Sequence, residues 1–369
     1  MSNRQEQGQL IASLKDTIKR IDEFNYEVNS QSGNGAYQVH STELGWNCSC
    51  PDYIFRGVKC KHIFAVEFSL ELRKKVESSI VIQQVNSLAC CYCHSDNVVK
   101  KAKRHNKYGD IQRYLCKVCG KRFSFNLGFE KMHATPQMIT SAMQLYFTGE
   151  SLRNVQKFLK LQGVNISHVA VYKWINKYVG LMEKYLQQIK PNVGNAWRTD
   201  ELYVKVKGSN KYLFALMDDE TRFWIARQIT DSKYTSDITP LFNKGKEVTG
   251  KRPNTLISDG APNFHIAFNK EFWTSKNPRT KHIRHIRLQG DHNNNKMERF
   301  NGEVRDREKV MRGLKRQDTK ILTGYQIFHN YVRPHEGLKG KTPAEESGIK
   351  VEGKNKWLTL IQNANKNSS

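Results

Sequence analysis

The sequence contains no apolar stretch long enough to cross a bilayer, and its first nine residues are polar with no apolar segment behind them. The first absence excludes a membrane-spanning helix, which needs about 20 predominantly apolar residues. The second excludes a secretory signal peptide. We therefore expect a cytoplasmic protein that does not bind a membrane. Because thiols stay reduced in that compartment, we expect the eight cysteines to bind metal rather than to form disulfides.

Acidic residues are also scarce, since 35 Asp and Glu face 60 Lys and Arg, for a net charge of +25. An excess of this size indicates a polyanionic partner such as nucleic acid. A protein that is merely basic and soluble, as in some thermophiles, is the plainer alternative. The hydrophobic share, 38% of 369 residues, is low for one large core and favours several small domains.

Changes in composition and periodicity divide the chain into five predicted segments. We expect a helix over 1–23, then a hairpin and a first metal-binding module, all within 1–80. A second metal-binding module follows in 86–128, and a group of helices in 134–190. An α/β domain is predicted over 193–350. A basic, polar tail, 351–369, ends the chain, and within it residues 357–361 could dock as a short helix.

The first cysteine cluster is Cys48-x-Cys50, followed after nine residues by Cys60-x-His62. Three thiolates and one imidazole complete a tetrahedral Zn²⁺ shell. Unrelated thiols beside a histidine on a helix are the alternative. With the preceding hairpin, Trp46 and a helix beginning near His62, the segment resembles the SWIM zinc finger, a module that binds DNA or protein.

The second cluster is Cys90-x-x-Cys93 with Cys116-x-x-Cys119, a spacing typical of a Zn²⁺-binding ribbon. Cys91 is left as a spare thiol. Between the two pairs lies a basic run that includes Lys100, Lys101, Lys103 and Arg104. On a ribbon held by zinc these side chains could contact DNA phosphates; a solvated charged loop is the alternative.

Three short helices are predicted after residue 134. Thr135, Ser151 and Ser167 are suitable N-caps, and Gly149 and Gly163 break the chain between the helices. This arrangement is typical of a helix-turn-helix domain, with His168 and Lys173 near the DNA end of the recognition helix. A plain helical bundle is the alternative.

Beyond residue 193 the pattern predicts three antiparallel strands (197–207, 212–217 and 223–228), a helix (238–248) and a further strand (254–260). A possible fifth strand, 283–288, and a polar helix, 293–309, follow. This is the order of a ribonuclease-H-like α/β core with a mixed five-stranded sheet. Asp218 and Asp219 follow the second predicted strand, and we expect both in the turn before the third.

Four motifs in this region carry a family resemblance. They are Thr199-Asp200-Glu201-x-Tyr203-Val204-Lys205-Val206, Ser258-Asp259-Gly260-Ala261-Pro262, Asn294-x-x-x-Glu298-Arg299-x-Asn301-Gly302, and Asn330-Tyr331-x-Arg333-Pro334-His335. Over about 193–348 the chain resembles the insertion-sequence DDE transposases, which have an integrase-like catalytic core.

The resemblance implies a catalytic triad of Asp200, Asp259 and Glu298 that holds Mg²⁺ or Mn²⁺. It implies metal-dependent DNA cleavage and attack of a DNA 3′-hydroxyl on a target phosphate. The expected partners are double-stranded DNA, as the element's terminal inverted repeats and the target, and further copies of the chain in a dimer or larger synaptic complex. The expected location is the cytoplasm of a prokaryotic cell, with the nucleoid.

Some residues near the triad leave alternatives open. Glu201 follows Asp200 on a strand, so it should point to the opposite face, to solvent or to a supporting position. Asp291 is a weaker candidate for the third acid. Asn294, Asn301 and Arg305 share a helix face with Glu298 and could contact DNA phosphates.

Other functions also fit parts of the sequence. A domesticated DNA-binding regulator would have lost an acid, whereas all three are present. A ribonuclease-H-type nuclease would cut without strand transfer. A zinc-dependent protein adaptor would explain the cysteines but not the four motifs.

Overall fold

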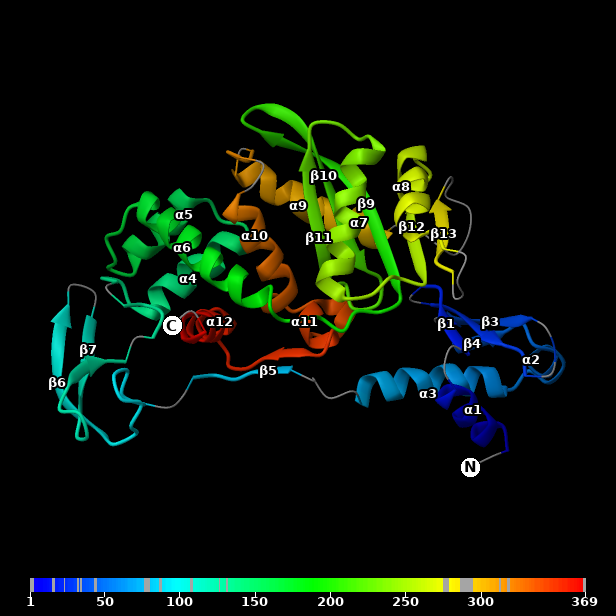
Figure 1. Cartoon of the computed structure of the whole chain (residues 1–369), viewed down its shortest axis with the longest axis horizontal. Coiled ribbons are helices and arrows are strands. Elements are labelled where there is room, and N and C mark those ends of the chain that lie inside the picture. The colour runs from blue at the N-terminus through cyan, green and yellow to red at the C-terminus, as the bar shows by residue number, and fades with distance from the viewer. Residues whose placement is uncertain are drawn as a thin grey trace.

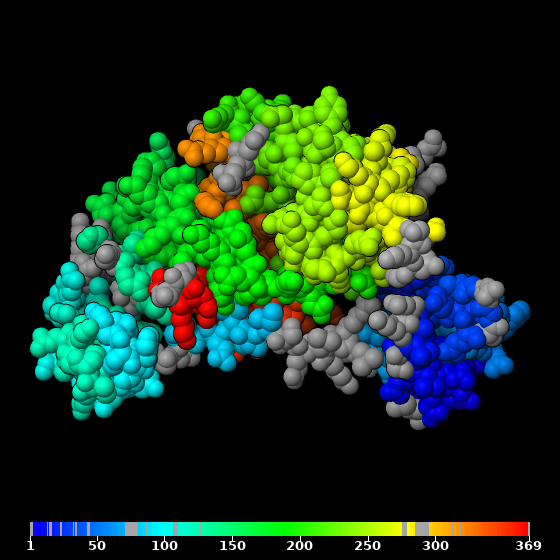
Figure 2. All heavy atoms as spheres, viewed as in Figure 1, coloured from blue at the N-terminus to red at the C-terminus, as the bar shows by residue number. Residues whose placement is uncertain are grey.

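The computed structural model describes residues 3–14, 17–22, 24–31, 33, 35–42, 45–75, 80–85, 88–106, 109–125, 127–130, 132–274, 279–285, 295–311, 313–316 and 319–367. A central α/β core and a helical unit lie side by side, and the two cysteine-rich modules lie at opposite ends (Figure 1). In the space-filling view both modules protrude on the same side of the core (Figure 2). None of the described helices is both long and apolar enough to span a bilayer.

The core is a five-stranded sheet in the order β11 (Trp224–Thr230), β10 (Ser209–Asp218), β9 (Ala196–Val206), β12 (Thr255–Asp259) and β13 (Lys281–His285). The first three strands are antiparallel, whereas β12 runs parallel to both β9 and β13. The predicted ribonuclease-H-like core with its mixed five-stranded sheet is confirmed. Three helices, α7 (Thr235–Thr249), α8 (Pro262–Phe272) and α9 (Asn295–Met311), complete it.

Strand β9 lies at the centre of this sheet and shows why the sequence forms it. Leu202, Val204 and Val206 are buried, while Tyr203 and Lys205 between them are exposed. This alternation is the period of two expected when one face of a strand packs on the core. At its start, Trp197 is fully buried and packs edge-on against Phe272 of α8.

The helical unit consists of α4 (Pro136–Thr148), α5 (Leu152–Leu161) and α6 (His168–Leu186). The predicted N-caps form, because the hydroxyls of Thr135, Ser151 and Ser167 each accept a backbone N–H from the first turn of the next helix. Helix α10 (Lys320–Ile327) packs on α6 and is followed by a π-helical turn, Phe328–Val332. Two short helical segments, Glu336–Leu338 and α11 (Pro343–Glu346), lead to the last strand.

The N-terminal module differs from the prediction. The expected helix over 1–23 is shorter, because α1 covers Asn3–Ser13 and Ile18–Arg20 form strand β1. Thr17 closes the end of the helix by donating to the carbonyls of Ile11 and Leu14. Strand β1 forms a four-stranded sheet with β2 (Asn25–Asn29), β3 (Ala36–Thr42) and β4 (Gly45–Cys48). Two helices, α2 (Pro51–Arg56) and α3 (Lys61–Lys75), follow this sheet in the chain.

The C-terminal segment also requires a correction, because most of it is not a tail. Strand β14 (Ile349–Val351) pairs in parallel with β5 (Ile80–Ile82). Helix α12 (Lys356–Lys366) then packs against α6 and α4, so the predicted docking of residues 357–361 is confirmed. The reason is its apolar spacing, i, i+3, i+4 and i+7, which buries Trp357, Leu360, Ile361 and Ala364 on one side of the helix.

The second cysteine-rich module is a three-stranded sheet of β6 (Val98–Asn106), β7 (Gly109–Cys116) and β8 (Arg122–Ser124). The basic run therefore lies on a strand rather than in a loop. Its side chains Lys100, Lys101, Lys103 and Arg104 are all exposed.

Candidate active site and metal centres

Two of the predicted acids lie side by side because neighbouring parallel strands carry them. Ile257 of β12 pairs with Arg198 of β9, so Asp259 and Asp200, two residues further along each strand, lie at the same edge of the sheet. One carboxylate oxygen each from Asp200, Glu201 and Asp259 lies within 4.8 Å of the others. The main chain supports two of these groups: the N–H of Glu201 donates to Asp200 Oδ1 at 2.9 Å, and the N–H of Ala261 donates to Asp259 Oδ1 at 3.1 Å.

Glu201 departs from the expectation that it points away from the metal-binding acids. The pairing of β9 with β12 ends at Arg198, three residues before Glu201. Its longer side chain places a carboxylate oxygen in the acid cluster. Oε2 is buried and makes no hydrogen bond to any residue that the structure describes, and Lys233 Nζ is 3.8 Å from Oε1.

Glu298 lies in the first turn of α9 and is exposed. It is outside the 4.8 Å cluster, but its negative charge contributes to raising the pKa of Asp200. The alternative acid Asp291 and the predicted DNA contact Asn294 lie outside the described residues.

Asn301 corrects a second expectation, because its side chain is buried rather than directed to DNA. Its Nδ2 donates to Asp200 Oδ2 at 2.8 Å. Since Asn301 follows Glu298 by one helical turn, this hydrogen bond fastens the helix of the third acid to the strand of the first.

Burial, together with the charges of neighbouring acids, raises the pKa values of Asp200 and Glu201. Burial, followed by the charges of Asp259 and Glu298, raises the pKa of Asp200 to about 6. Burial, then Asp259 and Asp200, raises the pKa of Glu201 to about 7. Both shifts mean that the ionised cluster lacks enough positive charge within the protein. Carboxylate oxygens are the ligands that Mg²⁺ and Mn²⁺ prefer, so the donor set and the unpartnered Glu201 oxygen both fit a hard divalent cation.

The first cysteine cluster brings together all four predicted ligands. Cys48, Cys50, Cys60 and His62 are each buried, and their ligand atoms lie within 4.8 Å of one another. His62 Nδ1 is 3.9 Å from the sulfurs of both Cys48 and Cys60, and the ring of Tyr37 lies tilted against the imidazole with the ring centroids 4.7 Å apart. This donor set fits a tetrahedral Zn²⁺ ion.

The second cluster contains Cys90, Cys93, Cys116 and Cys119. The Cys90–Cys119 sulfurs are 3.6 Å apart and the Cys93–Cys116 sulfurs 3.5 Å. Zn–S bonds of about 2.3 Å in a tetrahedron place sulfurs about 3.8 Å apart, so the spacing suits Zn²⁺. Cys91 is exposed and is not in the cluster.

The remaining predicted DNA contacts are spread over three elements. Lys100, Lys101, Lys103 and Arg104 lie on β6, His168 and Lys173 on α6, and Arg305 on α9. His168 is half-buried at the start of its helix, whereas Lys173 and Arg305 are exposed. The structure therefore does not bring these side chains together at one point.

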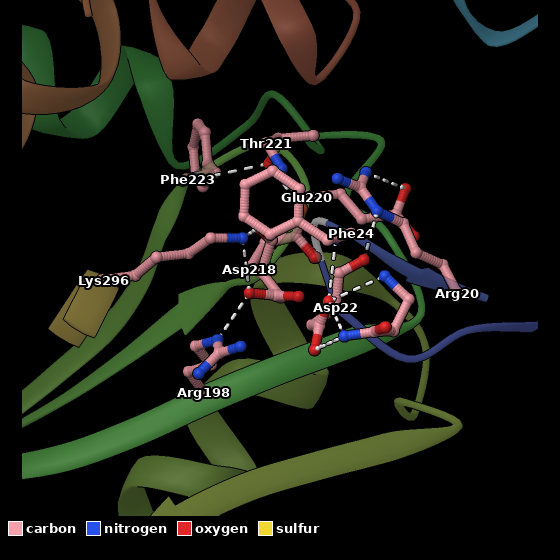
Figure 3. A network of polar contacts seen from close by, with 11 residues as sticks. Arg20, Asp22, Phe24, Arg198, Asp218, Glu220, Thr221, Phe223 and Lys296 are labelled. Atoms are coloured by element: carbon pink, nitrogen blue, oxygen red, sulfur yellow. Dashed lines mark hydrogen bonds and ion pairs between the residues drawn. The ribbon is translucent and has the colours of Figure 1, made fainter. Parts of the chain in front are cut away.

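Sequence reasoning missed a buried network beside the acids. Asp218 does act as a turn residue, since it accepts hydrogen bonds from the N–H and the hydroxyl of Thr221. Asp219 lies in the turn as well, but its side chain is fully buried and pairs with Arg198 at 2.5 Å and with Lys296 at 2.9 Å. Figure 3 shows Arg198 and Lys296 reaching this turn from two different elements. No local spacing signals this contact, because Asp219 and Lys296 are far apart in the sequence.

Comparison with known proteins gives matches to two parts of the chain. The family described as a DDE domain matches residues 194–335, and the SWIM zinc finger matches residues 37–71. A transposase for the insertion sequence-like element IS431mec of Staphylococcus aureus is 29% identical over 123 residues, which are 32% of this chain and 53% of that protein. A transposase for insertion sequence element IS257 in transposon Tn4003, also from Staphylococcus aureus, is 29% identical over 137 residues, 36% of this chain and 59% of that protein.

The chain thus spans between half and three-fifths of the length of these curated relatives. Among solved structures, the HTLV-2 integrase catalytic core domain in complex with magnesium aligns at 16% identity and a TM-score of 0.31, covering 43% of this chain and 98% of that one. A simian T-cell lymphotropic virus intasome in complex with PP2A regulatory subunit B56 gamma aligns at 15% identity and a TM-score of 0.33, covering 55% and 72%. Residues 194–335 of this chain thus match the DDE-domain family, residues 37–71 match the SWIM zinc finger, and the curated relatives with similar sequence are transposases of insertion sequences.

Proposed function

We propose that the chain is a transposase that binds the ends of a mobile DNA element and catalyses phosphodiester cleavage and strand transfer. The observation that carries this proposal is the acid cluster at the edge of the sheet. Asp200 lies within β9, Asp259 ends the neighbouring strand β12, and Asn301 fastens the helix that bears Glu298 to Asp200. Within a DDE domain, this arrangement supports a metal-dependent phosphoryl-transfer site.

In the proposed site, Asp200 and Asp259 hold Mg²⁺ or Mn²⁺, and Glu298 completes the ligand set. Bound there, two such cations activate the attacking oxygen and stabilise the leaving oxygen of an in-line displacement. The chain's own groups keep the ligands oriented: Asn301 and the Glu201 amide hold both oxygens of Asp200, and the Ala261 amide holds Asp259. Glu201 adds a further negative oxygen to the cluster.

We propose that both cysteine clusters bind Zn²⁺ and thereby stabilise modules that have small cores. The described core of the second module contains only Cys90, Cys116 and Phe123 as buried apolar residues. A core of that size does not offset the entropy of ordering the strands, so a bound metal has to contribute. Zinc would thus be required for folding rather than for the chemistry.

Recognition of DNA is assigned to the parts outside the core. Exposed Lys100, Lys101, Lys103 and Arg104 on β6 suit phosphate contact, and the capped helices α4 to α6 suit a helix-turn-helix with Lys173 toward the groove. The net charge of +25 supports the same partner. We further propose that the enzyme acts on DNA of the prokaryotic nucleoid as a dimer or larger synaptic complex, because two element ends must be processed together.

The decisive experiment is a strand-transfer assay on the full chain with the element's own terminal DNA and Mg²⁺. The test variant is Asp259→Asn, and the matched control is Asp231→Asn, which changes an exposed acid paired with Lys211. Joined products from the wild type and the control, absent from Asp259→Asn, would support a transposase. Cleavage without joining would favour a nuclease instead. Binding without either reaction in Mg²⁺ and Mn²⁺ would favour a domesticated DNA-binding protein.

A further inference from the structure

We propose that Asp219 is a positioning residue: through Lys296 it fixes the helix of Glu298 against the strand of Asp200. This inference rests on the proposed function, because it concerns how the third acid is aligned with the other two. It names a residue outside the three acids and outside their direct hydrogen-bond partners.

The first half of the bridge is on the sheet. Arg198 lies on β9 two residues before Asp200, and its Nε donates to Asp219 Oδ1 at 2.5 Å. Both side chains are almost completely buried, with 2% of Arg198 and none of Asp219 exposed. Because alternate residues of a strand share a face, this pair lies on the same side of β9 as the Asp200 carboxylate.

The second half is on the helix. Lys296 lies on the first turn of α9, two residues before Glu298, and its Nζ donates to Asp219 twice. One hydrogen bond goes to Oδ1 at 2.9 Å and the other to the backbone carbonyl at 3.0 Å. A single carboxylate oxygen of Asp219 therefore accepts from β9, which carries Asp200, and from α9, which carries Glu298.

Together with Asn301, this bridge ties α9 to the sheet on both sides of Glu298. Lys296 is held by Asp219 before Glu298, and Asn301 is held by Asp200 after it. Glu298 itself is exposed and has no such anchor of its own among the described contacts. Its position relative to Asp200 is thus set by the two residues that flank it.

The charges in the bridge are balanced within the protein. Burial opposes ionisation of Asp219, but Lys296 and Arg198 together hold its pKa below the ordinary value. It therefore stays a carboxylate, and it has no need of a metal ion. Removing one partner of a buried ion pair leaves charge uncompensated, so we expect loss of Lys296 to loosen the first turn of α9.

The test uses the full chain with three variants. Lys296→Met removes the charge, and Lys296→Arg keeps it. Lys244→Met is the matched control, because it breaks a lysine–glutamate pair that is exposed on α7. Asp219→Asn is avoided as the main variant since it removes the negative charge beside the buried Arg198 and risks misfolding. The readouts are single-turnover DNA cleavage at saturating DNA, Mn²⁺ titration, and hydrogen–deuterium exchange of residues 295–302.

For Lys296→Met we expect cleavage about 10-fold slower, a loss of about 1.4 kcal/mol of transition-state stabilisation, and a higher Mn²⁺ concentration at half-saturation. Hydrogen–deuterium exchange of residues 295–302 should be faster in Lys296→Met. Lys296→Arg should recover most of the cleavage rate, the Mn²⁺ affinity and the slow exchange. Lys244→Met should match the wild type in all three. Unchanged cleavage and exchange in Lys296→Met would overturn the positioning role. If the wild type itself cleaves no DNA, the proposed function fails, but the exchange and Mn²⁺ binding of the variants still decide whether Lys296 aligns this helix.

Discussion

Replacing Glu201 by Gln should stabilise the metal-free protein, although it removes an acid from the proposed active site. In the structure, burial and the charges of Asp259 and Asp200 raise the pKa of Glu201 to about 7, from an ordinary value of 4.5. The folded state therefore disfavours the ionised form that prevails at neutral pH. Gln has nearly the same shape without the charge, so it avoids this penalty.

The sign follows from linkage. The pKa of Glu201 is higher in the folded than in the unfolded chain, so the wild type loses stability as the pH rises from about 4.5 through about 7. One pKa unit corresponds to about 1.4 kcal/mol. Part of the Glu201 side chain is exposed to solvent, which screens the interaction. We therefore expect the ionised form to reduce the stability by about 1–2 kcal/mol rather than by the full equivalent of the pKa shift. The variant and the wild type should be equally stable below pH 4.5.

Thermal unfolding in EDTA at pH 5 and at pH 8 measures this effect. For a domain of this size a gain of 1–2 kcal/mol corresponds to a midpoint higher by about 2–8 °C, and it should appear at pH 8 alone. Added Mn²⁺ should reduce the difference, since only the wild type gains the full attraction between the ion and the cluster. A Glu201→Gln protein that is no more stable than the wild type at pH 8 in EDTA would refute the reasoning.

Three further predictions follow from other contacts. Asn301→Ala removes a hydrogen bond that lowers the pKa of Asp200, so the acidic limb of the cleavage rate against pH should move to higher pH; an unchanged limb would contradict this role. Mass spectrometry of the native protein should find two Zn²⁺ per chain, one in Cys60→Ser, and still two in Cys91→Ser, because Cys91 lies outside the cluster. Trp357→Ala empties a site where the indole stacks on Phe147 and donates to Gln144, so chemical denaturation should report a loss of about 3–5 kcal/mol, whereas a removable tail would give none.

The parts of the fold that could be predicted are those with a local signal. Alternation along β9, the capping hydroxyls before α4, α5 and α6, and the paired cysteines all depend on residues within a few positions of one another. The sheet order followed from the succession of elements. For the same reason, the expected tail was wrong only in part: the apolar spacing of residues 357–364 is local, but its partners on α4 and α6 are about 200 residues earlier.

Side-chain directions at the site were harder to predict than the site itself. Strand alternation places the Cβ of Glu201 on the face opposite Asp200, but it does not fix where the end of a long side chain lies. The Glu201 carboxylate still has an oxygen within 4.8 Å of those of Asp200 and Asp259. Helix spacing correctly placed Asn301 on the face of Glu298, but it does not tell whether that face meets DNA or the sheet. The hydrogen bond to Asp200 shows that, at Asn301, it meets the sheet.

Two neighbouring pairs of acids, Asp200-Glu201 and Asp218-Asp219, look alike in the sequence, yet their charge balance separates them. A buried carboxylate must be paired or remain protonated. Asp219 has two cations, Arg198 and Lys296, and its pKa falls below the ordinary value. Among the described residues, Glu201 makes one ion pair, with Lys233 at 3.8 Å, and its pKa is raised to about 7. Each of the two acids also has one buried oxygen that makes no hydrogen bond to the described residues, so the ion pairs are what distinguish them. The charge of Asp219 is therefore balanced within the protein, and this acid can serve as a structural bridge. Glu201 requires positive charge from outside the protein, as a metal-binding cluster does.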